Sequence, residues 1–532
     1  MHITKVVIKN YRCLSDICVP LNKHLNVLVG DNECGKSTFL EAIHLALTGQ
    51  LNGRMIQGEI HPHLFNTDAV KSYIEALIAK KRALPPRILI EIYLEDLDAF
   101  SALKGQNNSL RENVPGVKLT IEYNDEYSDE YATYVADPLI IKTIPVEYYH
   151  HHWRNFADNP ITARSIPIKP CLIDASAIRN NIAANRFVLD IVKEGLNKKQ
   201  QVELALSYRL MKDRFLADPK VQAINQLLAK KKDIVSHKAL TLSLDTSARA
   251  SWESNVIPHL DDIPMPLVGK GEQSSVKIKL SMEDSAEADL FLIEEAENHL
   301  SFPNLNILIK HIADRRKNRQ LLITTHSSFV LNKLGLDSVL LFRRDGTANL
   351  RALKSDTQDY FMKLPGYDTL RLILARRAIL VEGPSDELIV QKAFLMKYEK
   401  LPLEMGVDVI SVGSLAFKRF LEIAAIVKVE VDVITDNDGN VEKLRKKYMD
   451  FWEAERIFIS YSDDNTLKTL ESHLLHVNGR ELINTILGTT YATDEELLKF
   501  MHSNKTECAL RLFETETPWT VPDYIDDCVN NE

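Results

Sequence analysis

One segment near the amino terminus constrains the fold of this 532-residue chain more than any other. Residues 30–37 read Gly-Asp-Asn-Glu-Cys-Gly-Lys-Ser and match the pattern G-x-x-x-x-G-K-[ST], whose backbone N–H groups surround nucleotide phosphates. The apolar stretch 25–29 before it is typical of a strand, and the stretch after it has helical spacing. This context predicts a nucleotide-binding α/β domain. The candidate nucleotide-binding residues are Gly30, Asn32, Gly35, Lys36, Ser37 and Thr38, with Lys36 on the β and γ phosphates and Ser37 on magnesium.

Length, charge and cysteine content limit the number of domains, the kinds of partner and the compartment that can be expected. A chain this long favours two or three domains. Its net charge of -9 argues against a uniformly basic nucleic-acid coat but permits a local basic groove. The six cysteines form no C-x-x-C pair and suit a reducing compartment. Without a signal peptide or a membrane-spanning apolar run, a soluble, cytoplasmic protein is expected.

Two later strands end in polar residues that nucleotide hydrolases use. The apolar stretch 290–293 leads into Glu294 and Glu295, and the stretch 321–325 leads into His326. We expect Glu294 to bind the magnesium of ATP and Glu295 to activate the attacking water. The position of His326 at a strand end predicts a contact near the γ-phosphate.

A glycine-containing segment, Val268-Gly-Lys-Gly-Glu-Gln-Ser274, precedes the acidic strand end. With Arg12, the phosphate loop, Glu294, Glu295 and His326, it resembles the ABC ATPases of the SMC, RecF and OLD type. The resemblance implies that Gly271 and Ser274 contact a γ-phosphate held by a second subunit. Because the chain carries one loop and one such segment, a complete site needs two chains, and a homodimer is predicted.

A second group of acids lies in the C-terminal part of the chain. One predicted strand, 378–381, ends in Glu382-Gly-Pro-Ser-Asp386, and another, 431–435, ends in Asp436-Asn-Asp438-Gly. Parallel strands present their carboxyl ends at one edge of the sheet, so these carboxylates are expected to converge. Oxygen-only ligands favour Mg²⁺ or Mn²⁺, and two such ions hydrolyse phosphodiesters in known enzymes.

Glutamate on one strand end and D-x-D on the next resemble the Toprim fold of topoisomerases, primases and certain nucleases. Glu471 and Lys505 resemble later elements of the nuclease version. The resemblance implies that Glu471 completes the second metal site and that Lys505 offsets charge in the transition state.

The combination resembles the OLD (overcoming lysogenization defect) family. The resemblance implies an ATP-binding, metal-dependent DNA endonuclease, often in antiphage defence, with nuclease activity regulated by nucleotide. It also implies a homodimer or higher oligomer and, in some members, a helicase (as in Gabija systems) or a retron reverse transcriptase with its DNA as partner. Expected cofactors are ATP with one Mg²⁺ and two Mg²⁺ or Mn²⁺ ions at the Toprim site.

The expected fold class is α/β: an ABC-type, SMC/RecF-like ATPase domain with a helical insertion, followed by a small parallel-sheet Toprim domain. Within this frame, residues 239–244 are predicted as a strand. The expected parts are the ATPase over 1–165 and 238–355, a helical, dimerising insertion over 166–237, a linker over 356–377, and the Toprim domain over 378–532.

Other interpretations stay open at this point. An ATP-driven DNA clamp of the RecF or SMC type explains the first half but leaves the acids after residue 378 without a role. A bacterial primase would carry a cysteine-rich zinc module, which this sequence does not contain. A topoisomerase would need a domain with a nucleophilic tyrosine, for which the chain leaves little space. A scaffold that uses ATP only to set dimer geometry would not need intact Lys36, Glu295 and His326. The run His150–His152 is interpreted as a solvated or loop segment, because its spacing does not place two imidazoles on one face.

Overall fold

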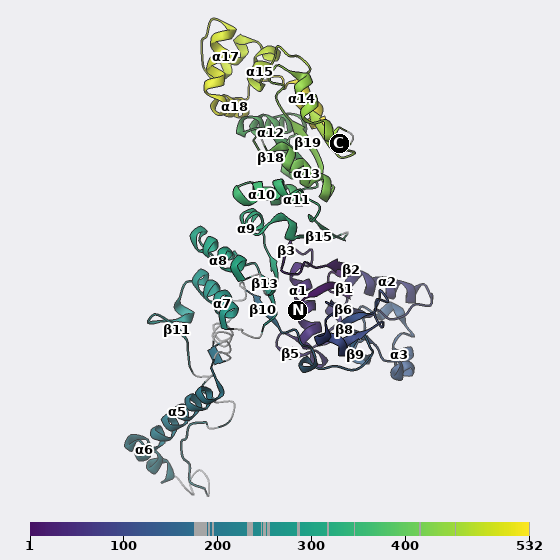
Figure 1. Cartoon of the computed structure of the whole chain (residues 1–532), viewed down its shortest axis with the longest axis vertical. Helices are drawn as coiled ribbons and strands as arrows, with labels where there is room; N and C mark the ends of the chain where they lie inside the picture. The colour runs from purple at the N-terminus through teal and green to yellow at the C-terminus, as the bar shows by residue number, and fades with distance from the viewer. Residues whose placement is uncertain are drawn as a thin grey trace. The chain divides into compact units, whose positions relative to one another are not determined.

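A computed structural model of the chain is drawn in Figure 1. It describes residues 1–174, 189, 192–193, 196–230, 238–245, 247, 252, 256–284, 288–315, 319–344, 346–413, 416–452 and 454–530. The chain divides into two compact units. Unit 1 comprises Met1–Leu25 and Ser37–Thr324, and unit 2 comprises Asn26–Lys36 and Thr325–Glu532.

An antiparallel sheet forms one part of unit 1. Its strands are β1 (Ile3–Tyr11), β2 (Leu14–Pro20), β6 (Ile88–Leu94), β7 (Lys104–Gly105), β8 (Val114–Tyr123) and β9 (Tyr149–Asn155). The order is β2-β1-β6-β8-β7, and β9 also pairs with β8. Figure 1 shows β1, β6, β8 and β9 next to one another, with α2 (Thr67–Ile78) and α3 (Ser128–Tyr134) at one side. Every residue of β6 is buried, as expected for a central strand.

The histidine run lies inside this sheet, which corrects the interpretation of it as a solvated or loop segment. His150, His151 and His152 belong to β9 and are half-buried. Side chains two residues apart share a face in a strand, so His150 and His152 do lie on one face of β9.

Unit 1 also contains three parallel strands. β10 (Pro170–Asp174) pairs with β13 (Leu290–Glu294), which pairs with β14 (Gln320–Thr324). The apolar residues of β13 and β14 are buried, as expected for strands covered on both faces. The Gln320 side chain accepts from the Ile3 N–H and donates to the Ile3 carbonyl, both at 2.8 Å, and so ties β14 to β1.

The helical insertion predicted over 166–237 is helical only in part: its first residues include the strand β10, and the helices follow later. α5 (Lys198–Ala217) and α6 (Pro219–Ala229) meet at Asp218, which ends α5 and caps α6. The stretches 175–188 and 231–237 of the insertion lie outside the described residues. The strand predicted over 239–244 was wrong: these residues form no strand, and Leu242 exchanges backbone hydrogen bonds with the Asn225 side chain instead.

In unit 2, β3 (Leu25–Gly30) lies parallel to β15 (Val339–Arg343), which pairs antiparallel with β16 (Gly346–Asn349). The stretch 356–377, expected to be a linker, carries most of α10 (Ser355–Lys363) and all of α11 (Thr369–Leu374). These helices bury Phe361, Thr369 and Ile373. Arg343 donates to the carbonyls of Ile373 and Val427, so this stretch packs as part of unit 2.

The C-terminal part of unit 2 is the small parallel α/β fold that the sequence predicts. Its strands run parallel in the order β18-β17-β19-β20. Figure 1 shows α12, α13 and α18 around them. The strands are β17 (Arg377–Val381), β18 (Val407–Ser411), β19 (Glu430–Ile434) and β20 (Ile457–Ser460), and the helices are α12 (Pro384–Tyr398), α13 (Phe417–Val427), α15 (Leu470–Asn478), α17 (Asp494–Ser503), α18 (Lys505–Glu514) and α19 (Asp523–Asn530).

Among the described residues, no helix combines the length and apolar character needed to cross a membrane.

Candidate functional site

The carboxyl ends of β17 and β19 place two acids side by side. The two strands are parallel neighbours with Leu380 opposite Val433, so Glu382 and Asp436 emerge at the same edge of the sheet. The Thr435 hydroxyl donates to Glu382 Oε1 at 2.8 Å and fixes one oxygen of that carboxylate. The sheet topology therefore brings these acids together at one edge of the sheet, which we call the acidic crevice.

Asp386 joins them from the first turn of α12. Its Oδ2 accepts from the Gly383 N–H at 3.1 Å, which holds the side chain against the turn that leaves β17. Burial, with the negative charge of Glu382 nearby, raises the pKa of Asp386 to about 6. Burial and nearby carboxylates, above all Asp386 and Glu382, raise the pKa of Asp436 to about 8.

Glu471 and Lys505 reach the same cluster from two later helices. Glu471 is buried in the first turn of α15, and Lys505 Nζ at the start of α18 lies 3.3 Å from its Oε1. Burial opposes the charge of Lys505, but Glu471 and the other acids outweigh it and raise the pKa of the ammonium group. Lys505 is thus a charged group held at the edge of the acidic crevice.

Asp438 differs from the other predicted ligands. Its side chain is exposed and its backbone has a φ of 50°. The turn is anchored by Asn437 between the two aspartates, which donates to the Ser462 carbonyl at 2.8 Å and accepts from the Gly439 N–H at 2.8 Å. A Cβ at Gly439 would lie 3.0 Å from Lys468, so this lysine packs against the turn.

The structure adds two residues to the cluster that the sequence analysis missed. His502 Nδ1 lies 3.3 Å from Glu471 Oε2. Tyr524 of α19 is buried, and its hydroxyl has no hydrogen-bond partner among the described residues. Burial and the charges of Asp436 and Asp386 raise its pKa well above the ordinary value. No local motif marks either residue, because both reach the crevice only through the packing of α17 and α19.

These donors fit divalent metal ions. Glu382, Asp386, Asp436 and Glu471 influence one another electrostatically, and burial together with the neighbouring negative charges raises the pKa values of Asp386 and Asp436. Oxygen donors of this kind bind Mg²⁺ or Mn²⁺, whose charge would stabilise the ionised carboxylates. Glu382, Asp386, Asp436 and Glu471 are the side chains that could hold such ions.

The phosphate loop has the backbone that its motif requires. Gly30 and Gly35 have φ values of 156° and 100°, and a Cβ at Gly30 would lie 2.4 Å from the Phe342 carbonyl oxygen. Lys36 Nζ donates to the carbonyls of Gly30 and Asp31, both at 2.8 Å. Asn32 and Ser37 are exposed beside it, and Thr38 is half-buried.

The acidic end of β13 is also shaped by local contacts. Glu295 has a φ of 46°, and its N–H donates to Thr324 Oγ1 at 2.9 Å. Asn298 donates to the Glu295 carboxylate, a contact that the sequence did not reveal. Glu294 ends the strand half-buried. His326 follows the end of β14 with an exposed side chain.

The glycine-containing segment begins α7 (Lys270–Asp284). Gly271 packs so tightly that a Cβ there would meet the His299 carbonyl oxygen at 2.1 Å. Ser274 is fully buried in this helix, while Gln273 donates to the Val268 carbonyl at 2.7 Å.

Two family models match this chain, one over the phosphate loop and one over the acidic crevice. Residues 1–331 match the family model of an AAA ATPase domain. Residues 373–438 match that of an overcoming lysogenization defect protein-like TOPRIM domain. The chain belongs to the OLD family of ATPase–Toprim fusions. The expected α/β fold class, with an ATPase domain followed by a parallel Toprim sheet, is thereby confirmed.

Individual relatives of this OLD-family chain are more distant. It is 30% identical over 95 residues to the DNA replication and repair protein RecF of Ligilactobacillus salivarius (strain UCC118), covering 15% of this chain and 24% of that protein. The OLD-family chain thus spans about a quarter of the length of this curated relative.

Solved structures include an SmcHead bound to the C-winged helix domain of ScpA, with TM-score 0.36, 13% identity and coverage of 66% of this chain and 98% of that one. Another is the SMC head domain from Thermotoga maritima, with TM-score 0.30, 12% identity and coverage of 64% and 94%. Likeness at this level carries no argument about function.

Proposed function

We propose that this OLD-family chain is an ATP-binding, metal-dependent DNA endonuclease that nicks or cleaves its substrate. The observation that carries the proposal is the crevice where Glu382, Asp386, Asp436 and Glu471 influence one another electrostatically. Such a concentration of acids suits phosphodiester hydrolysis at divalent ions, and the Toprim match supports the same chemistry.

Each residue of the crevice has a separate role in this proposal. Glu382, Asp386 and Asp436 would hold one Mg²⁺ or Mn²⁺ ion, and Glu471 would complete a second site with them. When bound, such ions activate water and stabilise the leaving oxygen of a phosphodiester. Lys505 stays protonated beside Glu471 and offsets negative charge that develops on the phosphate. Asp438, which is exposed, is a further candidate ligand for one of these ions.

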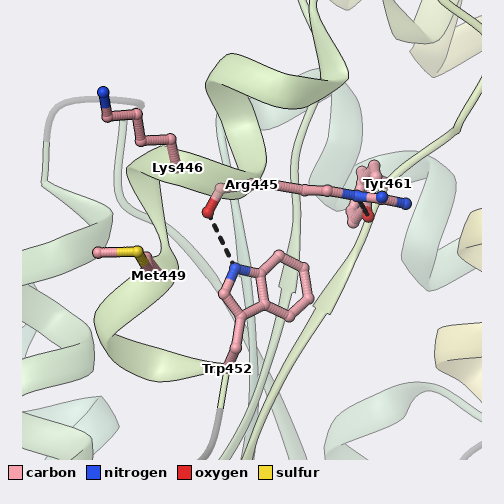
Figure 2. A pocket seen from close by; sticks show the side chains of 5 residues that line it. All are labelled: Arg445, Lys446, Met449, Trp452 and Tyr461. Carbon is pink, nitrogen blue, oxygen red and sulfur yellow. Dashed lines mark hydrogen bonds between the residues drawn. The ribbon is translucent and has the colours of Figure 1, made fainter.

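An exposed pocket on the same unit suits a nucleic-acid substrate. Figure 2 shows the Arg445 side chain extending beside Tyr461 and the indole of Trp452 donating to the Arg445 carbonyl at 3.0 Å. Lys446 and Met449 complete the lining of this pocket of about 670 Å³. Exposed aromatic rings stack on bases, and arginine and lysine contact phosphates.

The position of this pocket along the chain supports its link to the crevice. α14 (Val441–Lys447), which carries Arg445 and Lys446, begins directly after the turn that holds Asp436 and Asp438. Trp452 is 41% exposed, so its ring is available to a base. We assign this pocket to the DNA strand that enters the crevice.

ATP binding is assigned to the phosphate loop, with Lys36 on the phosphates and Ser37 on the magnesium ion. Glu294 and Glu295 would serve the metal and the attacking water, and His326 the γ-phosphate. Gly271 and Ser274 would face the nucleotide of a second chain, although the buried Ser274 side chain would have to become accessible. Nucleotide binding is proposed to regulate the nuclease.

A homodimer is supported by the insertion. α5 and α6 expose Val202, Leu206, Leu210 and Leu227, with exposed fractions from 49% to 67%. Exposed apolar side chains at this density mark association surfaces. A cytoplasmic role in antiphage defence, with or without a helicase or a reverse transcriptase, is proposed from the family resemblance alone.

An ATP-driven DNA clamp without nuclease activity is the second candidate, favoured by the match to RecF. Incubating the full chain with supercoiled plasmid separates the two. The nuclease proposal expects nicked or linear DNA with Mg²⁺ or Mn²⁺ and none with a chelator, and lanes with ATP report regulation. DNA binding and ATP hydrolysis without cleavage in any lane would favour the clamp.

A further inference from the structure

Three potential metal ligands meet on one face of the antiparallel sheet in unit 1, apart from the phosphate loop and the acidic crevice. β8 and β9 pair with Glu122 opposite His150 and Thr120 opposite His152. Because side chains alternate along a strand, His150 and His152 share the face of Glu122, and His151 points to the opposite face. One ligand atom from each of the three residues lies within 4.8 Å of the other two.

The three side chains also contact one another directly. The rings of His150 and His152 lie 4.2 Å apart between centroids, and His152 Nε2 is 3.8 Å from Glu122 Oε1. His150 Nε2 is buried, yet it has no hydrogen-bond partner in the part of the chain that the structure describes. A buried polar nitrogen without a partner is costly, and a metal ion would satisfy it.

We propose that Glu122, His150 and His152 form a binding site for a divalent transition-metal ion of the Zn²⁺ class. Two imidazoles and one carboxylate are ligands that suit Zn²⁺, whereas all-oxygen sets suit Mg²⁺ or Mn²⁺. Donor atoms around tetrahedral Zn²⁺ lie roughly 3.3 Å apart, as bond lengths of about 2.0–2.1 Å imply. Small side-chain rotations would bring the three atoms to that spacing.

The surroundings leave a coordination position for a further ligand. Glu122 and His152 line a polar pocket of about 460 Å³ together with Arg87, Lys118 and Arg154. Arg87 approaches the other carboxylate oxygen of Glu122, Oε2, at 3.9 Å, so Oε1 remains on the side of His152. Three protein ligands with basic side chains nearby favour water or an anionic oxygen as the fourth ligand.

The site is tested with Co²⁺, which reports tetrahedral nitrogen and oxygen coordination by strong visible absorption, whereas octahedral oxygen sites absorb weakly. The full-length chain is titrated with CoCl₂, and ZnCl₂ is then added as a competitor. We expect one tetrahedral Co²⁺ per chain and its displacement by Zn²⁺. Absence of the strong band from the unsubstituted protein would overturn the proposal.

Substitutions test whether the visible absorption band of Co²⁺ comes from an ion bound by Glu122, His150 and His152. Glu122→Gln and His152→Asn should each abolish it, while His151→Asn, one residue away on the opposite face, should keep it. Asp436→Asn should also keep it, which separates this site from the acidic crevice and from the nuclease proposal. Retention of the band in folded Glu122→Gln or His152→Asn protein, or its loss in His151→Asn, would contradict the assignment.

Discussion

At the scale of a single residue, Asp436 shows how crowded carboxylates change the protonation of the acidic crevice. Its pKa of about 8, raised by burial and by Asp386 and Glu382, means that the metal-free side chain holds a proton at neutral pH. Asp386, with a pKa of about 6, is mostly ionised there. The two carboxylates thus differ in charge until a cation binds.

Metal binding should therefore release protons. A raised folded-state pKa means that Mg²⁺ or Mn²⁺ competes with a proton, so apparent affinity should increase from pH 6 to about pH 8 and then level off. Calorimetry in buffers of different ionisation enthalpy measures the release, which we expect to be about one proton at pH 7. In Asp436→Asn the release should vanish. Affinity that is independent of pH over this range would contradict the assigned ligand.

Lys36 permits a second test at this scale. Lys36→Ala removes a cation from the phosphate loop and should weaken ATP binding roughly 10- to 150-fold, as expected for about 1.5–3 kcal/mol of charged hydrogen bonding. Lys23→Ala, an exposed lysine before the loop, is the matched control. Calorimetric titration with ATP measures both, and equal affinities would refute the role of Lys36.

Some residues could be predicted from the sequence and others could not, for a physical reason. Lys36, Glu382 and Asp436 follow apolar strands within a few residues, so local pattern and chemistry identify them together. Tyr524 and His502 carry no such pattern, because only the packing of late helices brings them to the crevice.

At the scale of elements, pairing between distant strands decides what a local pattern means. His150 and His152 appear unsuited to one ligand site until β9 is known to be a strand, and Glu122 joins them only through β8. Residues 239–244 have the apolar pattern of a strand but pair with no strand in the described part of the chain, and the Asn225 side chain bonds the backbone groups of Leu242 instead. Sequence gives the periodicity of an element but not its partner.

Arg377 joins β17 to β19 and should be important for stability. It donates to Asp432, which is fully buried, at 2.9 Å and to the Cys528 carbonyl at 2.8 Å. Arg377→Ala removes the guanidinium group that neutralises this buried carboxylate and should cost about 3–5 kcal/mol of unfolding free energy. Arg480→Ala, which breaks the exposed pair with Asp494, should cost only about 0–1 kcal/mol. If urea unfolding showed the same loss of unfolding free energy in Arg377→Ala and Arg480→Ala, the buried pair would not contribute more to stability than the exposed one.

The pocket around α14 makes a prediction about DNA. Trp452→Ala should weaken binding of single-stranded DNA roughly 5- to 150-fold, since stacking contributes about 1–3 kcal/mol per base. Tyr127→Ala, an exposed aromatic residue of unit 1, serves as the control and should leave binding unchanged. Fluorescence anisotropy with a labelled oligonucleotide measures the DNA affinity of both variants. Unchanged affinity in Trp452→Ala would remove this pocket from the DNA path.

At the scale of the whole molecule, the chain combines a nucleotide-binding half with an acidic, parallel-sheet half. The two family matches and the order of motifs along the chain agree on this organisation. Both parts could be predicted because each has its own strand–loop signature. The packing of 356–377 as α10 and α11 could not, since its polar, proline- and glycine-containing sequence resembles a linker.

The measurement that tests the central claim most directly is plasmid cleavage by Asp436→Asn beside Glu430→Gln. Both acids flank β19, but Asp436 follows its carboxyl end in the crevice and Glu430 begins the strand at the other edge. With Mg²⁺ or Mn²⁺ present, we expect Asp436→Asn to lose cleavage by roughly 1000-fold, since metal ions contribute several kcal/mol to such reactions. Glu430→Gln should cleave normally, and both should bind ATP like the unsubstituted chain. Undiminished cleavage by folded Asp436→Asn protein would contradict the assignment of the crevice as the nuclease centre.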